Sequence, residues 1–203
     1  VAIYCSSLEE WNKMKVLIFG ISGNPIHLGH LDAANIASEW FDEVWIMPSN
    51  SSNSKDLVDS DHRLQMAKLA VDENNNSKIK VFDYLIKNDI KESTYYLMSR
   101  LRVEYDYDFY FMIGTDNVID IKNWINCEKL LGEVKFFIIE RQGHSFSSNL
   151  NLFKSFIYLK TNIKEASSTE IRNNFLNKDL SVNYLYLNKS VLNYIITNKL
   201  YGI

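Results

Sequence analysis

Short apolar runs alternate with segments of helical periodicity along the chain from residue 16 onward. Each run is four to six residues long and rich in β-branched and aromatic residues, which is typical of buried strands. The pattern predicts strands at 16–19, 43–47, 79–82, 108–113, 134–139 and 156–159. Strands that alternate with helices are joined by crossover connections, which produce a parallel sheet. We therefore expect an α/β fold, a Rossmann-like parallel sheet with helices on both faces.

The segments between the runs repeat their apolar residues every three to four positions, which predicts helices. Helices are expected to begin at residue 28, after cap residues at 59–61, at 91–94, and over a last segment at 185–200 that packs on the sheet. In the third of these, we expect Leu97, Leu101 and Val103 to face the core.

The composition of the chain is that of an ordinary globular protein. No internal repeat or linker divides the 203 residues, so we expect a single domain over 1–203, with 1–13 as a lead-in. The net charge of −3 indicates neither a nucleic-acid nor a membrane surface as partner. No apolar run reaches the roughly 18–20 residues that span a bilayer. Cys5 and Cys127 fit no metal-ligand spacing and favour a reducing, cytoplasmic compartment.

Two histidines follow the first predicted strand, where the chain turns and a helix begins. The turn contains Gly20, Gly23 and Pro25, and the helix opens at His27 and His30. A helix N-terminus presents unpaired backbone N–H groups and the positive end of the helix dipole, which favours a phosphate. Gly20 would let the backbone approach the anion. Residues three apart share a helix face, so both histidine rings can reach the same phosphate oxygens.

A second helix N-terminus is predicted near the end of the chain. Ser167 with Glu170 three residues later forms a capping box, which marks the start of a helix. Ser168, Thr169 and Arg172 then lie in or near the first turn of that helix.

These motifs together resemble the signature of the nucleotidylyltransferase superfamily. The string His27-Leu-Gly-His30 after the turn Gly20-Ile-Ser-Gly-Asn-Pro25 is most similar to nicotinate/nicotinamide mononucleotide adenylyltransferases of the compact bacterial type. Ser22 keeps the hydroxyl of the family turn, whereas Ile21 replaces its second glycine; Ile still offers a backbone N–H. Ala166-Ser-Ser-Thr-Glu-Ile-Arg172 resembles the family motif Ile-Ser-Ser-Thr-x-Ile-Arg. The resemblance extends from about Met14 to the end of the chain.

The resemblance implies a binding site for ATP. His27, His30 and Arg172 would be the catalytic residues, and Mg²⁺ would be bound mainly through the ATP phosphates. Gly114-Thr-Asp116 follows the fourth strand, and Asp116 would bond the ribose hydroxyls of the adenosine. The remaining residues implied to bind ATP are Gly20, Ile21, Ser22, Gly114, Ser167, Ser168 and Thr169.

A second set of residues is implied to bind a pyridine mononucleotide, namely Ser49, Asn50, Thr94, Trp124 and Arg141. Trp124 would stack on the pyridine ring; its alternative is a core aromatic. The family order Ser-Tyr-Thr appears here as Ser93-Thr94-Tyr95, and Thr94 is the candidate.

Two further positions bear on this site. The chain lacks the Pro-Pro-His element of relatives in its loop at 49–55, where Lys55 is either a phosphate contact or a solvated lysine. Arg63 either shapes the substrate pocket or lies on the surface of its helix.

The function implied by the resemblance is transfer of the adenylyl group of ATP to nicotinate mononucleotide in NAD biosynthesis. The nicotinamide mononucleotide is a second acceptor to consider, and a homo-oligomer is compatible with this interpretation. Two alternatives stay open. One is another adenylyltransferase, such as a pantetheine-phosphate adenylyltransferase. The other is a catalytically silent nucleotide-binding domain.

Overall fold

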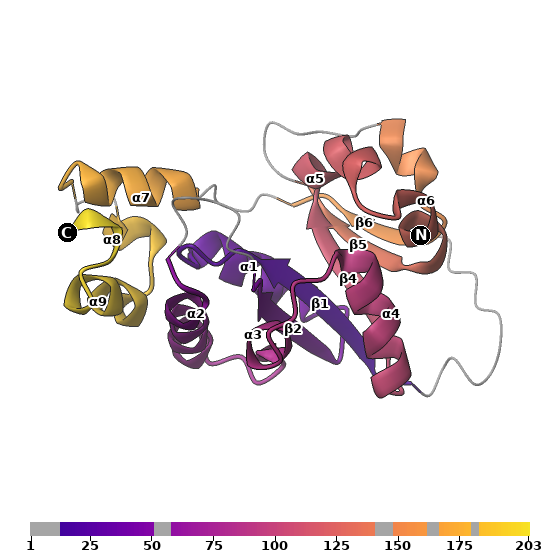
Figure 1. Cartoon of the computed structure of the whole chain (residues 1–203), viewed down its shortest axis with the longest axis horizontal. Coiled ribbons are helices and arrows are strands. Elements are labelled where there is room, and N and C mark those ends of the chain that lie inside the picture. Colours follow the sequence, from indigo (N-terminus) through magenta and orange to yellow (C-terminus); the bar gives the residue numbers. More distant parts are fainter. Residues whose placement is uncertain (1–12, 51–57, 141–147, 162–166, 180–182) are drawn as a thin grey trace.

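The computed structural model describes residues 13–50, 58–140, 148–161, 167–179 and 183–203 (Figure 1). The described chain contains one six-stranded sheet with the order β3-β2-β1-β4-β5-β6. All its neighbouring strands pair in parallel. The strands are β1 (Lys15–Ile21), β2 (Glu43–Pro48), β3 (Ile79–Val81), β4 (Asp108–Gly114), β5 (Lys135–Ile139) and β6 (Phe156–Leu159).

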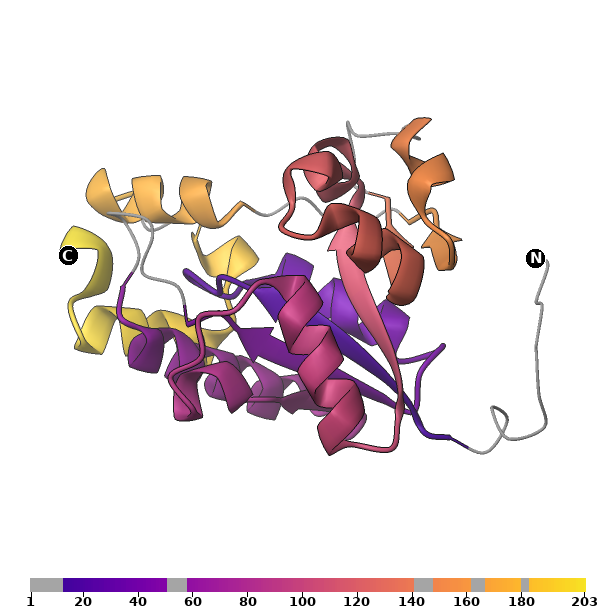
Figure 2. The ribbon, with the colours of Figure 1, turned by 45° about the vertical axis from the view of Figure 1, so that its right-hand side comes forward.

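Helices connect successive strands and cover both faces of the sheet (Figures 1 and 2). The α-helices are α1 (Leu28–Ala37), α2 (Ser60–Asn74), α3 (Tyr84–Lys87), α4 (Thr94–Glu104), α5 (Thr115–Asp120), α6 (Cys127–Glu133), α7 (Ser168–Leu176), α8 (Asn183–Tyr186) and α9 (Lys189–Thr197). Short 3₁₀ turns are η2 (Ile121–Asn123), η3 (Ser148–Leu152) and η4 (Leu200–Gly202). In both views the gold and yellow elements α7, α8 and α9 gather at one end, where α9 packs against α2.

The core lies in two layers because β1 is buried on both faces. Successive strand residues point to opposite faces. Leu17 and Phe19 therefore join the cluster under α1, α2, α7 and α9, whereas Val16 and Ile18 join the cluster under α4, α5 and α6. A strand without a solvent face explains why the first apolar run shows no alternation with polar residues.

The strand order places a topological switch point beside β1. From β1 the chain runs outward through β2 and β3, then crosses back to pair β4 with the other edge of β1. In such sheets the loops at the carboxyl ends diverge around the switch point and leave a crevice for ligands. The starts of α1 and α5 both lie at this edge, since they follow β1 and β4.

The structure confirms the predicted fold class and all six strands within two residues at each end. β1 extends to Ile21, so the turn begins later than expected. The predicted last helix over 185–200 is instead α8, α9 and η4. The short helices α3, α5 and α6 were not predicted, since seven or fewer residues show too little periodicity. Among the described residues, no helix is long and apolar enough to cross a bilayer.

The prediction for Val103 is wrong. Val103 is 88% exposed, whereas Leu97 and Leu101 are buried. Positions four apart share a helix face, but a further step of two residues turns the side chain to the opposite side.

The difference in burial between Leu101 and Val103 on α4 can be tested through stability. Leu101→Ala should lower the free energy of unfolding by about 2–5 kcal/mol, because it removes buried methyl groups and leaves a cavity. Val103→Ala should change it by less than about 0.5 kcal/mol, as is usual for a surface position. Urea denaturation midpoints of the two variants make the comparison. Equal effects would contradict the orientation of α4.

Candidate active site

The turn between β1 and α1 reverses the chain within six residues, from Ser22 to His27. Gly23 adopts φ +62°, a left-handed conformation that glycine enters without steric cost. The Asn24–Pro25 peptide bond is cis. His27 is extended and serves as the N-cap of α1. The turn therefore delivers both histidines to the carboxyl edge of the sheet.

His27 and His30 lie side by side at the start of α1. Both are at least nine-tenths buried, and their ring centroids are 3.8 Å apart. The backbone N–H of His27 donates to Nδ1 of His30 at 3.3 Å. Because that nitrogen accepts, a neutral His30 carries its proton on Nε2. The single N–H of a neutral His30 ring therefore lies on Nε2, at the N-terminus of α1.

The start of α7 is docked on the same turn. Ser168 Oγ donates to the carbonyl of Pro25 at 3.0 Å, and Arg172 Nη1 donates to the carbonyl of Asn24 at 2.9 Å. Arg172 Nη2 also reaches Thr169 Oγ1 at 3.3 Å. Ser167 is the N-cap of α7, as predicted, and accepts from the N–H of Glu170 at 3.5 Å. Two helix N-termini from distant parts of the sequence therefore meet at one turn.

Arg63 on α2 holds the other side of this turn. It is 1% exposed, so the alternative of a surface arginine is wrong. Nη1 donates to the carbonyl of Ser22 at 2.7 Å and to Ser49 Oγ at 3.3 Å. Nε donates to the carbonyl of Val58 at 3.1 Å. Burial lowers the pKa of Arg63, but an arginine pKa stays far above neutral, so its charge is retained beside the turn.

Gly20 on β1, Phe111 on β4 and Trp124 after η2 lie in a row beside the turn. Gly20 is solvent-exposed, and a Cβ placed on it would lie 3.2 Å from the ring of Phe111. The rings of Phe111 and Trp124 pack nearly perpendicular to each other, with centroids 6.4 Å apart. Trp124 follows η2 and is only partly buried, so one part of the indole remains available to a ligand. Asp116 lies in the first turn of α5, directly after β4.

The residues expected to bind the pyridine nucleotide come from several segments. The N–H of Ser49, just after β2, donates to the carbonyl of Ile21 at 2.8 Å, which joins it to the phosphate turn. Asn50 Nδ2 donates to Asp89 at 2.9 Å. Thr94 is the first residue of α4.

Two of the expected positions, Arg141 and Lys55, lie outside the described residues.

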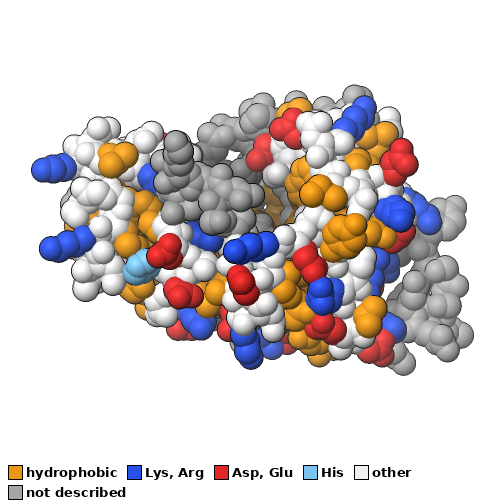
Figure 3. All heavy atoms as spheres, in the orientation of Figure 1, with side chains coloured by type: hydrophobic (Ala, Val, Ile, Leu, Met, Phe, Trp, Pro, Cys, Tyr) orange, Lys and Arg blue, Asp and Glu red, His pale blue; other side chains and the backbone are white. Residues whose placement is uncertain are grey.

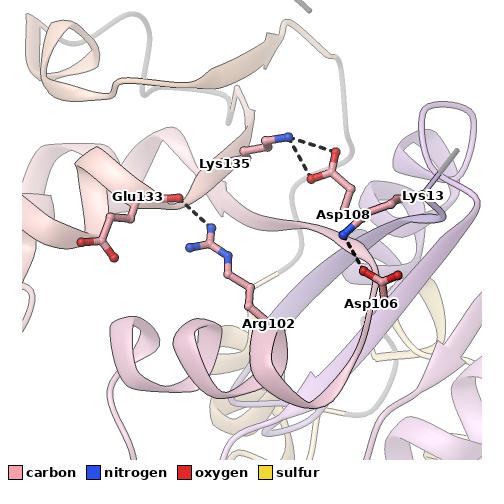
Figure 4. Close-up of polar contacts among 6 residues, drawn as sticks. All are labelled: Lys13, Arg102, Asp106, Asp108, Glu133 and Lys135. Atoms are coloured by element: carbon pink, nitrogen blue, oxygen red, sulfur yellow. Dashed lines mark hydrogen bonds and ion pairs between the residues drawn. The ribbon is translucent and has the colours of Figure 1, made fainter. Parts of the chain in front are cut away.

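The opposite, amino-terminal edge of the sheet contains a separate hollow of about 330 Å³ (Figure 4). Its charged side chains make polar contacts within the hollow: Lys135 contacts both oxygens of Asp108 at 2.9 and 3.1 Å, and Arg102 donates to the backbone carbonyl of Glu133 at 2.7 Å. Lys13 pairs with Asp106. This hollow lies at the edge away from the histidines and does not contribute to the candidate site.

Charges of both signs are interspersed over the face shown in Figure 3. The charge relevant to an anion is therefore local and comes from the arginines around the turn. Among the described residues, no three His, Cys, Asp or Glu side chains gather in a group that could hold a metal ion.

A family model, curated relatives and a solved structure all relate this chain to nucleotidylyltransferases. Residues 18–174 match the family model described as cytidylyltransferase-like. The chain is 34% identical over 175 residues to a probable nicotinate-nucleotide adenylyltransferase of Fusobacterium nucleatum, covering 82% of this chain and 90% of that protein. It is 31% identical over 193 residues to the nicotinate-nucleotide adenylyltransferase of Bacillus subtilis, covering 92% and 98%.

Among solved structures, the chain is similar to the Plasmodium falciparum nicotinic acid mononucleotide adenylyltransferase complexed with NaAD. The two share a TM-score of 0.77 and 28% sequence identity, with 93% of this chain and 97% of the other covered.

The role of Arg63 can be tested through stability. Arg63→Lys should lower the free energy of unfolding by about 1–3 kcal/mol, because one ammonium group cannot reach three segments and leaves buried carbonyls without donors. Arg102→Lys, at an exposed arginine that also donates to a carbonyl, is the matched control and should cost less than about 0.5 kcal/mol. Urea denaturation measures both. Similar losses would mean that Arg63 does not join these segments.

Proposed function

The chain belongs to the cytidylyltransferase-like family and, within it, to the nicotinate-nucleotide adenylyltransferases, and we propose that it transfers the adenylyl group of ATP to nicotinate mononucleotide. The observation that carries this proposal is the docking of α7 on the turn before α1. It brings His27, His30 and Arg172 to the carboxyl edge of the sheet. We treat residues 1–203 as a single nucleotidylyltransferase domain.

The phosphates of ATP would lie between the N-termini of α1 and α7. His30 would donate from Nε2 to an oxygen of the α-phosphate, with His27 beside it. The described contacts of Arg172 go to the neutral acceptors Asn24 and Thr169, and no carboxylate in the described part of the chain forms an ion pair with it. It would hold the β- and γ-phosphates. Asp116, after β4, would bond the ribose hydroxyls.

The reaction would need no nucleophile from the protein. An oxygen of the acceptor's 5′-phosphate attacks the α-phosphorus, and the bond from that phosphorus to the bridging oxygen of the β-phosphate breaks. Pyrophosphate leaves with the electron pair, and the product is nicotinate adenine dinucleotide. The protein contributes positioning of the two phosphates and stabilisation of the charge that develops between them.

Mg²⁺ would be carried by the triphosphate rather than by a protein cage. Mg²⁺ prefers oxygen ligands and keeps several waters. The side chains closest to the proposed phosphate position are imidazole and guanidinium groups, with the hydroxyls of Ser22 and Thr169 nearby. These residues fit a metal bound through phosphate oxygens and water, and the ion would supply neutralisation of phosphate charge.

The choice of the acid over the amide acceptor is supported by the names of the relatives and by the donors around the proposed ring position. A ring carboxylate needs N–H or hydroxyl donors. Ser49, Asn50 and Thr94 offer such groups, and Trp124 offers an aromatic face. Asp89 beside Asn50 is paired with Lys91 at 3.7 Å, which offsets its repulsion of an acid.

Acceptor preference tests the proposed substrate. We expect pyrophosphate release from ATP with nicotinate mononucleotide, and a kcat/KM at least about tenfold above that for nicotinamide mononucleotide, since a site that bonds one ring substituent rejects the other. Phosphopantetheine should give no release. A ratio at or below one would refute the acid preference. Release with phosphopantetheine alone would assign the enzyme to a different acceptor.

His30 tests the proposed chemistry. His30→Ala should lower kcat by about 10²–10³, the usual effect of removing one preorganised donor to a transition state, with circular dichroism unchanged. His62→Ala is the control, because His62 bonds Tyr194 between α2 and α9, away from the turn. Near-normal turnover of His30→Ala, or an equal loss in the control, would contradict the assigned role.

A further inference from the structure

The turn η4 packs against the last residues of α7, Phe175 and Leu176. It also contacts the phosphate turn, where Tyr201 reaches Asn24 across 177 residues of sequence. Tyr201 in η4 donates from Oη to Asn24 Oδ1 at 2.9 Å. The same oxygen accepts the backbone N–H of Val58, just before α2, at 3.3 Å. A single side-chain oxygen in the phosphate turn thus joins η4 and the segment that leads into α2.

The ring of Tyr201 is aligned with α7. It stacks on Phe175, with ring centroids 5.9 Å apart and an angle of 21°. Phe175 is fully buried and lies one helical turn after Arg172 on α7. Tyr201 therefore contacts both the helix that carries Arg172 and the residue whose carbonyl Arg172 bonds.

The backbone of η4 is held in an uncommon conformation. Lys199, Tyr201 and Gly202 have φ values of +50°, +61° and +84°. A bulky residue with positive φ is a steric outlier that persists only where its surroundings enforce it. At Gly202 the positive φ favours glycine, and an added Cβ would lie 3.0 Å from Leu176 Cδ2 on α7, which would have to shift. This arrangement places the Tyr201 hydroxyl at the turn.

Two guanidinium groups act on the same hydroxyl. Burial raises the pKa of Tyr201 well above its usual range, and the charges of Arg172 and Arg63 lower it by less. The phenol is therefore protonated at neutral pH and acts as a donor toward Asn24. The Tyr201 hydroxyl is therefore close to Arg63 and Arg172, the two arginines that hold the turn from α2 and from α7.

We propose that Tyr201 is a positioning residue for adenylyl transfer, whose hydroxyl holds Asn24 so that the phosphate turn and Arg172 keep the arrangement that receives the ATP phosphates. Asn24 links Tyr201 to Arg172, because its side-chain oxygen accepts from Tyr201 while its backbone carbonyl accepts from Arg172. This inference rests on the proposed function, since it assumes that the phosphates lie at this turn. The proposal gives η4, at the end of the given sequence, a role in binding ATP at a turn near its beginning.

The test is Tyr201→Phe, which removes the hydroxyl and keeps the ring on Phe175. At saturating acceptor, kcat/KM for ATP should fall about 5- to 10-fold, the effect of one lost hydrogen bond. At saturating ATP, KM for nicotinate mononucleotide should change less than about twofold, because the turn faces the phosphates of ATP.

The matched control is Tyr194→Phe. It removes a partly buried tyrosine hydroxyl that bonds His62 Nδ1 at 2.9 Å, between α2 and α9. Its effect on thermal stability should be similar to that of Tyr201→Phe, but its kinetics with ATP should match the wild type. An equal loss of kcat/KM for ATP in both variants would mean that Tyr201 acts only through stability.

A double-mutant cycle shows whether Tyr201 acts through Asn24. On an Asn24→Ala background, Tyr201→Phe should change kcat/KM for ATP by less than about twofold, since its partner is already lost. If the fold-changes in kcat/KM for ATP simply multiply in the double variant, the proposal is overturned. An unchanged kcat/KM for ATP in Tyr201→Phe alone would also overturn it.

ATP binding separates this inference from the proposed function. Titration calorimetry with ATP and Mg²⁺ should show a Kd about 5- to 10-fold weaker for Tyr201→Phe than for the wild type, and no change for Tyr194→Phe. If the wild type releases no pyrophosphate with any acceptor, the proposed function fails. The calorimetric comparison then still decides the role of Tyr201 at the phosphate turn.

Discussion

The structure depends on how the backbone carbonyls of one turn are satisfied. Between β1 and α1 the chain leaves the sheet, so the carbonyls of Ser22, Asn24 and Pro25 receive side-chain donors instead of ladder bonds. Buried carbonyls need such partners. The donors come from Arg63 on α2 and from Ser168 and Arg172 on α7, so satisfying the turn also fixes two distant helices against it. The position of the histidines at the start of α1 follows from this constraint.

Local patterns predicted the parts of the fold whose cause is local. The six strands and the fold class follow from apolar runs and their alternation with helices. The start of α7 follows from Ser167 and Glu170, because a capping box involves only four consecutive residues. Val103 is hydrophobic but does not belong to the core, because the helical phase set by Leu97 and Leu101 points it outward.

The contacts that complete the candidate site could not be predicted in the same way. The partners of Arg63 lie up to 41 residues away, and Tyr201 meets Asn24 across 177 residues. Neither position carries a periodic or capping signal for these contacts, since the tertiary arrangement alone creates them. The sequence Gly-Asn-Pro is a strong turn signal, and a positive φ at Gly23 is typical of such a turn. No comparable signal surrounds Tyr201, so its positive φ could not be predicted from the sequence.

The same arrangement separates the groups proposed for phosphate chemistry from those proposed for the acceptor. The first belong to the turn after β1 and to α7, whose described contacts run from the side chains of Ser168 and Arg172 to backbone carbonyls of the turn. The described members of the second set come from the end of β2, from α4 and from the residue after η2. There, side chains such as Asn50 and Thr94 carry few of the contacts that hold the turn. Substitutions at the acceptor side would change a side chain without removing a donor from the turn. A fold built in this way can keep one nucleotidyl-transfer site while its acceptor varies.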